Sequence, residues 1–200
     1  MSLRSHYLRE NGVAANGLLQ AALGLSQQVG SLFYAYLASY AFGKISGAAG
    51  MTGTRDYTRR QWAPLILAAA AVFAVAMVAA TPLLRLLYSH RFDPARPLMA
   101  WALLGEFGRV GLMAWALGSL PLGGTRLWLP ISLVFPASLA VSYAFLAASG
   151  AGILSLPKAY AMAAFLSLGA AGGMMSGRGV TLSARGLALL LAGALALLAL

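Results

Sequence analysis

Residues 83–109 have the sequence LLRLLYSHRFDPARPLMAWALLGEFGR, in which a short charged loop separates two apolar runs. The loop region carries four charged side chains, Arg85, Arg91, Asp93 and Arg96. The second apolar run carries Glu106 and Arg109 inside it, three residues apart and therefore on one face of a helix. Charged groups inside an apolar helix are costly unless they are paired or face water, so these two residues indicate a functional site.

The composition of the whole chain places these runs in a membrane. Of its 200 residues, 60% are hydrophobic and 9% are charged, and the mean hydropathy is +0.80. A soluble domain carries about a quarter charged residues, so we expect an integral membrane protein. The net charge of +10 comes from bases that lie mostly in the loops, which favours contact with anionic membrane lipids and argues against nucleic acid as a partner.

We expect an all-α fold: a polytopic membrane helix bundle that forms a single transmembrane domain over residues 1–200. A bilayer crossing needs about 20 residues, and about six runs approach this length. The predicted spans cover residues 13–42, 62–87, 98–120, 127–148, 156–175 and 180–200. Pro82 is expected to kink the second span, and Pro130 and Pro136 to bend the fourth. The polar first twelve residues are expected to form a loop or a helix cap and not a targeting peptide.

The first predicted span is unusually polar. Its polar side chains recur at steps of three, four and seven residues, which places them on one face of a helix. This polar stripe consists of Asn16, Gln20, Gln27, Ser31 and Tyr34. Two interpretations are open: the stripe forms hydrogen bonds between helices inside a bundle, or it lines a hydrated cavity that holds a substrate.

Two interpretations are also open for Glu106 and Arg109. They form either a structural ion pair that locks the bundle or a cavity-facing pair that senses a substrate or protons. Small residues recur beside the pair and permit a second helix to approach closely; they are Gly105, Gly108 and Gly111. Arg85 lies near the end of the second span and can reach the lipid headgroups.

Other kinds of site find little support in the sequence. The chain has no Cys, and His6 and His90 lie outside the spans and far apart in sequence, so we expect no metal site. It contains neither a P-loop nor a Gly-x-Ser-x-Gly motif, so we expect no nucleotide cofactor and no enzyme activity.

Three stretches resemble the C-terminal half of the polysaccharide (O-antigen type) flippases, which belong to the multidrug/oligosaccharidyl-lipid/polysaccharide exporter superfamily. Residues 3–28, LRSHYLRENGVAANGLLQAALGLSQQ, are similar to a family helix with Gly, two residues, and then Gln-Ala. Residues 86–109, LLYSHRFDPARPLMAWALLGEFGR, resemble a passage that ends in Gly-acid-x-x-Arg. Residues 144–165, AFLAASGAGILSLPKAYAMAAF, resemble a span that ends in a Gly-rich turn before the next span starts.

The resemblance implies a transporter of the bacterial inner membrane that flips a polyprenyl-pyrophosphate-linked oligosaccharide. Such a flippase works by alternating access, during the synthesis of O-antigen, lipopolysaccharide or another surface polysaccharide. The family has two lobes around a central cavity and this chain resembles one of them, so we expect a truncated reading frame or a half that needs a partner lobe.

The resemblance also implies roles for the polar side chains. Those expected to meet the sugar headgroup are Asn16, Gln20, Gln27 and Tyr34, and Arg85 or Arg109 would bind the pyrophosphate. A drug or ion antiporter of the same superfamily and a non-transporting membrane assembly subunit are the alternative functions.

Overall fold

The computed structural model describes residues 3–47, 50–177 and 191–195. Within these ranges every regular element is helical and no strand occurs, so the prediction of an all-α fold is confirmed. The α-helices are α1 (Leu3–Tyr36), α2 (Phe42–Ser46), α3 (Gly50–Val78), α4 (Ala80–Leu87), α5 (Arg96–Gly123), α6 (Thr125–Ala148) and α7 (Ser155–Ser176).

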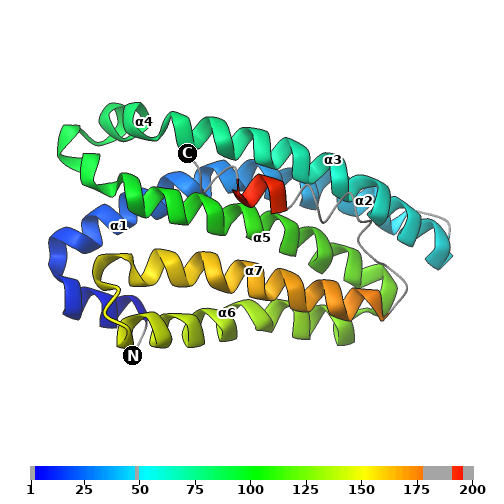
Figure 1. The fold of residues 1–200 in the computed structure, drawn as a ribbon. Coiled ribbons are helices and arrows are strands. Elements are labelled where there is room, and N and C mark those ends of the chain that lie inside the picture. The colour runs from blue at the N-terminus through cyan, green and yellow to red at the C-terminus, as the bar shows by residue number, and fades with distance from the viewer. Residues whose placement is uncertain (1–2, 48–49, 178–190, 196–200) are drawn as a thin grey trace.

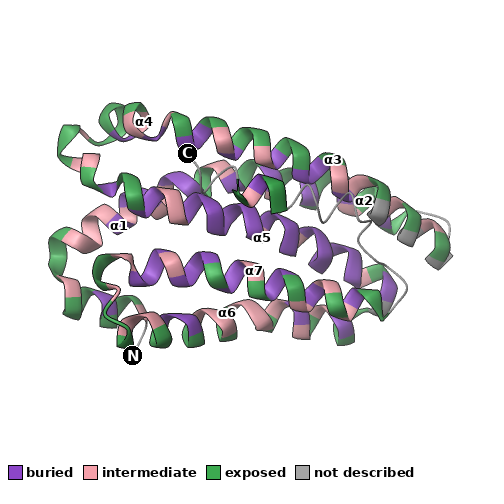
Figure 2. Ribbon diagram, viewed as in Figure 1, coloured by how far each residue is buried: buried purple, intermediate pink, exposed green. Residues whose placement is uncertain are grey.

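Helix α5 is the centre of the bundle (Figure 1). It packs against α1 and α3 on one side and against α6 and α7 on the other. Between Leu98 and Ser119 almost every residue is buried, whereas α3 and α6 are exposed along one side (Figure 2). A helix that is apolar on all sides is expected in the interior of a bundle. The position of α5 therefore follows from the same stretch that carries Glu106 and Arg109.

The contact between α5 and α7 depends on three glycines spaced three residues apart. Gly105 faces the ring of Tyr160, Gly108 faces Ala164, and a Cβ at Gly108 would lie 3.0 Å from the Cβ of Ala164. A Cβ at Gly111 would lie 3.2 Å from Leu168. The helices thus meet at the close distance that the repeated glycines predict.

The predicted span over residues 62–87 is not one continuous helix, because the structure divides it into α3 and α4 at Ala79. Ala79 has ψ of 3°, and α3 ends at Val78. Pro82 explains this position, since proline has no N–H to bond the carbonyl four residues earlier and its ring collides with that carbonyl. The effect of Pro82 is therefore a break one turn before it and not a gentle kink.

The start of the chain is also more ordered than predicted. Residues 3–11 are helical and not a loop, and they are separated from the rest of α1 by Gly12, whose φ of 80° and ψ of 174° are not helical. The Tyr7 hydroxyl donates a hydrogen bond of 2.8 Å to the carbonyl of Ile153, in the connection between α6 and α7. At its other end α1 runs into a π-helical turn, Leu37–Ala41, which leads to α2.

The prediction of about six spans is not supported by the described residues, in which three helices are long and apolar enough to cross a membrane. These are Arg60–Val78, Thr125–Ala148 and Gly152–Ser176. Helix α1 is not among the three because its side-chain amides lower its mean hydropathy. Helix α5 is not among them because Glu106 and Arg109 have the same effect. Residues 180–200 lie outside the described part of the chain except for 191–195. Three such helices are compatible with a multi-pass membrane protein.

We expect Gly105→Ala to weaken the contact between α5 and α7. The added methyl group would overlap the Tyr160 ring and lie 3.2 Å from the backbone nitrogen of Ala161. Overpacking of this kind costs about 1–3 kcal/mol, so thermal unfolding of the purified chain in detergent should occur at a lower temperature. Gly169→Ala is the matched control, because a Cβ at Gly169 meets nothing within 4 Å. Equal unfolding temperatures for the two variants would contradict this account of the interface.

Candidate functional site

The candidate site is built around the carboxylate of Glu106 at the middle of α5. Glu106 is 0% exposed, and most of its neighbours along α5 are buried apolar residues. An ionised carboxylate in such a place is strongly destabilising unless donors satisfy its oxygens. The sequence therefore requires other elements to supply donors at this depth.

Three side chains from three helices supply the donors. The Tyr34 hydroxyl of α1 donates to Oε2 of Glu106 over 2.5 Å. The Tyr160 hydroxyl of α7 donates to Oε1, and Nη1 of Arg109 donates to the same oxygen over 3.1 Å. Nη1 of Arg109 also donates to the Tyr160 hydroxyl over 2.6 Å. The network joins α1, α5 and α7 through one buried charge.

Glycine makes the approach of α1 possible. A Cβ at Gly30 would lie 2.6 Å from Oε2 of Glu106, closer than any carbon can stand to that oxygen. Gly30 lies one helical turn before Tyr34, so the open space at Gly30 and the donor at Tyr34 meet the same carboxylate. This role of Gly30 is not visible in the sequence, where many other glycines occur in similar surroundings.

Arg109 differs from its partner because its side chain is 33% exposed. Its guanidinium lies against three aromatic rings, with centroids 5.6 Å away at Tyr34, 5.1 Å at Phe135 and 5.7 Å at Tyr160. Such contacts orient a guanidinium and stabilise it where water is scarce. Arg109 is therefore held by a carboxylate on one side and by aromatic faces around it.

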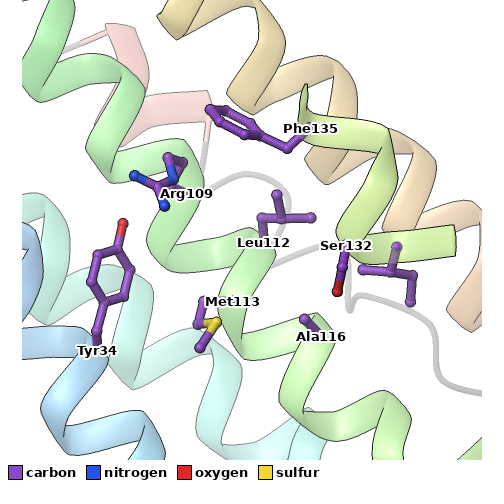
Figure 3. A pocket seen from close by; sticks show the side chains of 8 residues that line it. Tyr34, Arg109, Leu112, Met113, Ala116, Ser132 and Phe135 are labelled. Carbon is purple, nitrogen blue, oxygen red and sulfur yellow. The ribbon is translucent and has the colours of Figure 1, made fainter. Parts of the chain in front are cut away.

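The exposed part of Arg109 faces a pocket of about 330 Å³ between α1, α5 and α6. Figure 3 shows Tyr34, Arg109 and Phe135 near one end and Leu112, Met113, Ala116 and Ser132 along the walls. Ile131 completes the lining. Most of this surface is apolar, and the charge enters at one fixed point. The arrangement suits an anionic group attached to a larger apolar or neutral body.

The structure brings only part of the polar stripe to this pocket. Tyr34 lines it, while Gln27 and Ser31 are exposed on the same helix, and Ser31 donates to the Gln28 carbonyl over 2.6 Å. Asn16 and Gln20 are half-buried nearer the start of α1. The stripe is therefore divided between the pocket and the end of the bundle.

The partners at that end come from the segment before Gly12. With its amide oxygen turned toward Arg4, the Gln20 side chain accepts hydrogen bonds from Arg4 over 3.1 and 3.3 Å. The Oδ1 atom of Asn16 is buried and has no hydrogen-bond partner among the described residues. The bend at Gly12 brings Arg4 back toward Gln20, which the linear sequence does not indicate.

Arg85 is not part of the pocket. It lies on α4, is 59% exposed, and forms an ion pair of 2.8 Å with Asp93, which follows in the loop before α5. The hydrogen bonds from Arg85 hold the pKa of the Asp93 carboxyl below its usual value of 3.8. The structure thus separates Arg85 from Glu106 and Arg109 and gives it a partner of its own.

Tyr160 and Phe135 are the site residues that sequence reasoning missed. Tyr160 is 54 residues from Glu106 in the chain, and no periodic pattern singles it out among the eight tyrosines. The Tyr160 hydroxyl is brought to Glu106 only by the packing of α7 on α5.

No family model matches this chain. No curated protein and no solved structure matches it either. Within residues 3–47, 50–177 and 191–195, no group of three His, Asp or Glu side chains lies close enough to hold a metal ion. The pocket itself combines a guanidinium held by Glu106 with apolar walls, and such a combination can bind and orient an anion.

We expect Glu106→Gln to destabilise the chain, because it leaves Arg109 and two hydroxyls around an uncharged amide. Breaking a buried pair costs about 3–5 kcal/mol, and the lower end of this range applies because Arg109 is partly exposed. Chemical unfolding in detergent measures the loss. Adding Arg109→Gln should restore part of the stability, since no unpaired charge then remains. A double variant no more stable than Glu106→Gln would argue against the pairing.

We expect the Arg85–Asp93 ion pair to add stability that disappears in acid. Because the folded-state pKa of Asp93 is lowered, its contribution is present above the unfolded value of 3.8 and is lost as the pH falls through the folded value. Asp93→Asn should therefore lower the unfolding temperature at pH 7 by a small amount, as for exposed pairs in general, and the difference should shrink below pH 3.8. An unchanged difference would exclude titration of Asp93 as its source.

Proposed function

We propose that this chain is one lobe of a membrane transporter that flips a polyprenyl-pyrophosphate-linked oligosaccharide across the bacterial cytoplasmic membrane, for the synthesis of a surface polysaccharide. The observation that carries the proposal is Arg109. Its guanidinium is anchored on the fully buried Glu106, and its side chain, which is 33% exposed, lines a pocket between α1, α5 and α6. A permanent positive charge at this depth has little use except to meet an anion or to complete an ion pair, and here it can do both.

The free donors of Arg109 suit a pyrophosphate. Within the described part of the chain, the hydrogen bonds of its guanidinium all run through Nη1. Nε and Nη2 are left to meet a ligand. A guanidinium stays charged at every physiological pH and offers paired donors that match phosphate oxygens. The negative charge of Glu106 balances the charge of Arg109 while the pocket is empty. The substrate therefore binds beside an ion pair that is already stable.

The pocket is too small for a whole lipid-linked oligosaccharide. About 330 Å³ accommodates a ligand of the size of a pyrophosphate with one sugar, so further sugars need additional space. Gln27 and Ser31 are exposed on α1, the helix that carries Tyr34 to the pocket, and such side chains are better matched to a hydrated cavity or a partner protein than to lipid tails. We infer that a second lobe faces α1 and α6 and completes the cavity, and that the lipid tail stays in the bilayer.

Helix α6 supplies the part of the wall that can move. Pro130 and Pro136 lie inside it, and Ile131, Ser132 and Phe135 between them line the pocket. The missing N–H of Pro136 leaves the Ser132 carbonyl without its helical partner, so this segment bends more easily than the rest of the bundle. Bending there would widen or close the pocket, as alternating access requires.

One observation favours the alternative of an antiporter driven by ions. Glu106 is a buried carboxylate in contact with two hydroxyls, which is an arrangement that can exchange protons. It is, however, 0% exposed and in contact with the positive charge of Arg109. A carboxylate that is sealed in this way is better suited to holding Arg109 than to exchanging ions with the pocket.

We expect the full chain in detergent to bind a polyprenyl pyrophosphate more tightly than the corresponding polyprenol. Arg109→Gln should weaken binding of the pyrophosphate about 10- to 100-fold, since hydrogen bonds to charged groups contribute about 1.5–3 kcal/mol. Native mass spectrometry with both lipids measures the difference. Arg126→Gln removes an exposed arginine that does not line the pocket and should leave binding unchanged.

Equal binding of pyrophosphate and polyprenol, or equal effects of Arg109→Gln and Arg126→Gln, would contradict the proposed substrate.

A cellular measurement separates a transporter from an assembly subunit. Loss of a flippase leaves the lipid-linked oligosaccharide on the cytoplasmic face, where an added glycosidase cannot reach it. An unchanged external pool after deletion would exclude translocation.

A further inference from the structure

A second hollow lies between α1 and α3, where a groove of about 370 Å³ runs along the two helices. Most of its lining is apolar, and its two ends differ in chemistry. Leu32 and Val72 form one end, and Tyr36 and Gln61 form the other, where the Tyr36 hydroxyl donates to the Gln61 amide over 3.4 Å. The floor between the ends consists of Phe33, Pro64, Leu65 and Ala68. The groove is therefore apolar along its length and polar at one end.

The polar end continues into a ladder of aromatic rings and a cation. The Tyr36 ring stacks on the Tyr40 ring with centroids 5.6 Å apart, and the ammonium of Lys44 lies 5.8 Å from the centroid of Tyr40. The π-helical turn Leu37–Ala41 carries Tyr40 and connects these residues. Turns of this kind often mark functional sites in helices. The ladder leads from the groove to a positive charge.

The position of the ladder matches the expected boundary of the membrane. The apolar segment of α3 starts at Arg60, next to Gln61 at the polar end of the groove. Tyrosine and lysine are typical of the level of the lipid headgroups. Residues 44–60 contain four basic side chains against one acidic side chain, Asp56. Of the basic side chains, Lys44 and Arg60 are exposed near this level, and positive charge there attracts anionic lipids.

We propose that this groove binds an anionic phospholipid, with an acyl chain along the α1–α3 floor and the phosphate at the polar end, where Tyr36 and Lys44 flank Tyr40. The two ends of a phospholipid match the two ends of the groove. The apolar acyl chain lies toward Val72, and the charged phosphate lies at the start of the membrane segment. The inference rests on the chain being embedded in a membrane and not on glycan transport. The groove is separate from the Arg109 pocket, with which it shares no lining residue.

The headgroup is tested first. The full chain is purified in micelles that contain equal amounts of phosphatidylglycerol and phosphatidylcholine, and native mass spectrometry counts the lipids that remain bound. We expect phosphatidylglycerol to be retained in preference, and Lys44→Gln to lower the preference about fivefold. Lys158→Gln is the matched control, because Lys158 also lies over an aromatic ring, 5.4 Å from the centroid of Trp101, but far from the groove in sequence and on another helix.

The acyl chain is tested by filling the groove. Ala68→Phe places a ring in the floor and should remove retention of both lipids at this site, whereas Ala140→Phe changes an equally exposed alanine of α6 and should not. Both variants should keep the helix content of the parent chain, because both alanines are exposed. Equal retention of the two lipids, equal effects of Lys44→Gln and Lys158→Gln, or equal effects of the two phenylalanine variants would each overturn the proposal.

Discussion

The burial of the Glu106 carboxylate is the constraint on which the rest of the structure depends. Taking an ion from water into the apolar interior costs several kcal/mol even after the surroundings relax. The bundle offsets this cost with donors from Tyr34, Arg109 and Tyr160. Each donor is a strong contact because its acceptor is charged. The position of α1 and α7 against α5 follows from the need to deliver these donors to one point.

That need also explains where the small residues lie. Gly30 leaves space for Oε2 of Glu106, and Gly105 leaves space for the ring of Tyr160. Larger side chains at either position would push a donor away from the carboxylate. In a membrane, helices gain little from burying apolar surface against one another, so close packing and hydrogen bonds must supply the association. At this site Gly30 and Gly105 permit both the close packing of the helices and the hydrogen bonds to Glu106.

A feature of the fold or of the Glu106 site could be predicted from the sequence only where the residues that cause it lie close together in the chain. The all-α fold and the placement of Glu106 and Arg109 on one helix face are local properties of the chain, and they could be predicted. The donor on α7 could not, because Tyr160 lies 54 residues after Glu106 in the chain and reaches it only when α7 has folded back onto α5. The partner of Gln20 depends likewise on the turn at Gly12.

Glu106 and Arg109 have the geometry of a structural ion pair and of a cavity-facing pair at the same time. The carboxylate is sealed inside the bundle, as a structural ion pair requires, whereas the guanidinium is open to the pocket on its other side. A sealed anion fixes the position of the exposed cation. The cost of ordering Arg109 is then met during folding and not when an anion binds, which favours tight binding by a single residue.

Helix α1 is the element that connects the two hollows of the bundle. Tyr34 reaches toward α5 and lines the Arg109 pocket, while its neighbours Phe33 and Tyr36 line the groove toward α3. The ring of Phe33 stacks on Phe73 of α3, with centroids 5.9 Å apart, so α1 is held from both sides. A ligand in either hollow would therefore contact the same helix, and that helix is fixed by the Tyr34–Glu106 hydrogen bond on one side and by the ring of Phe73 on the other.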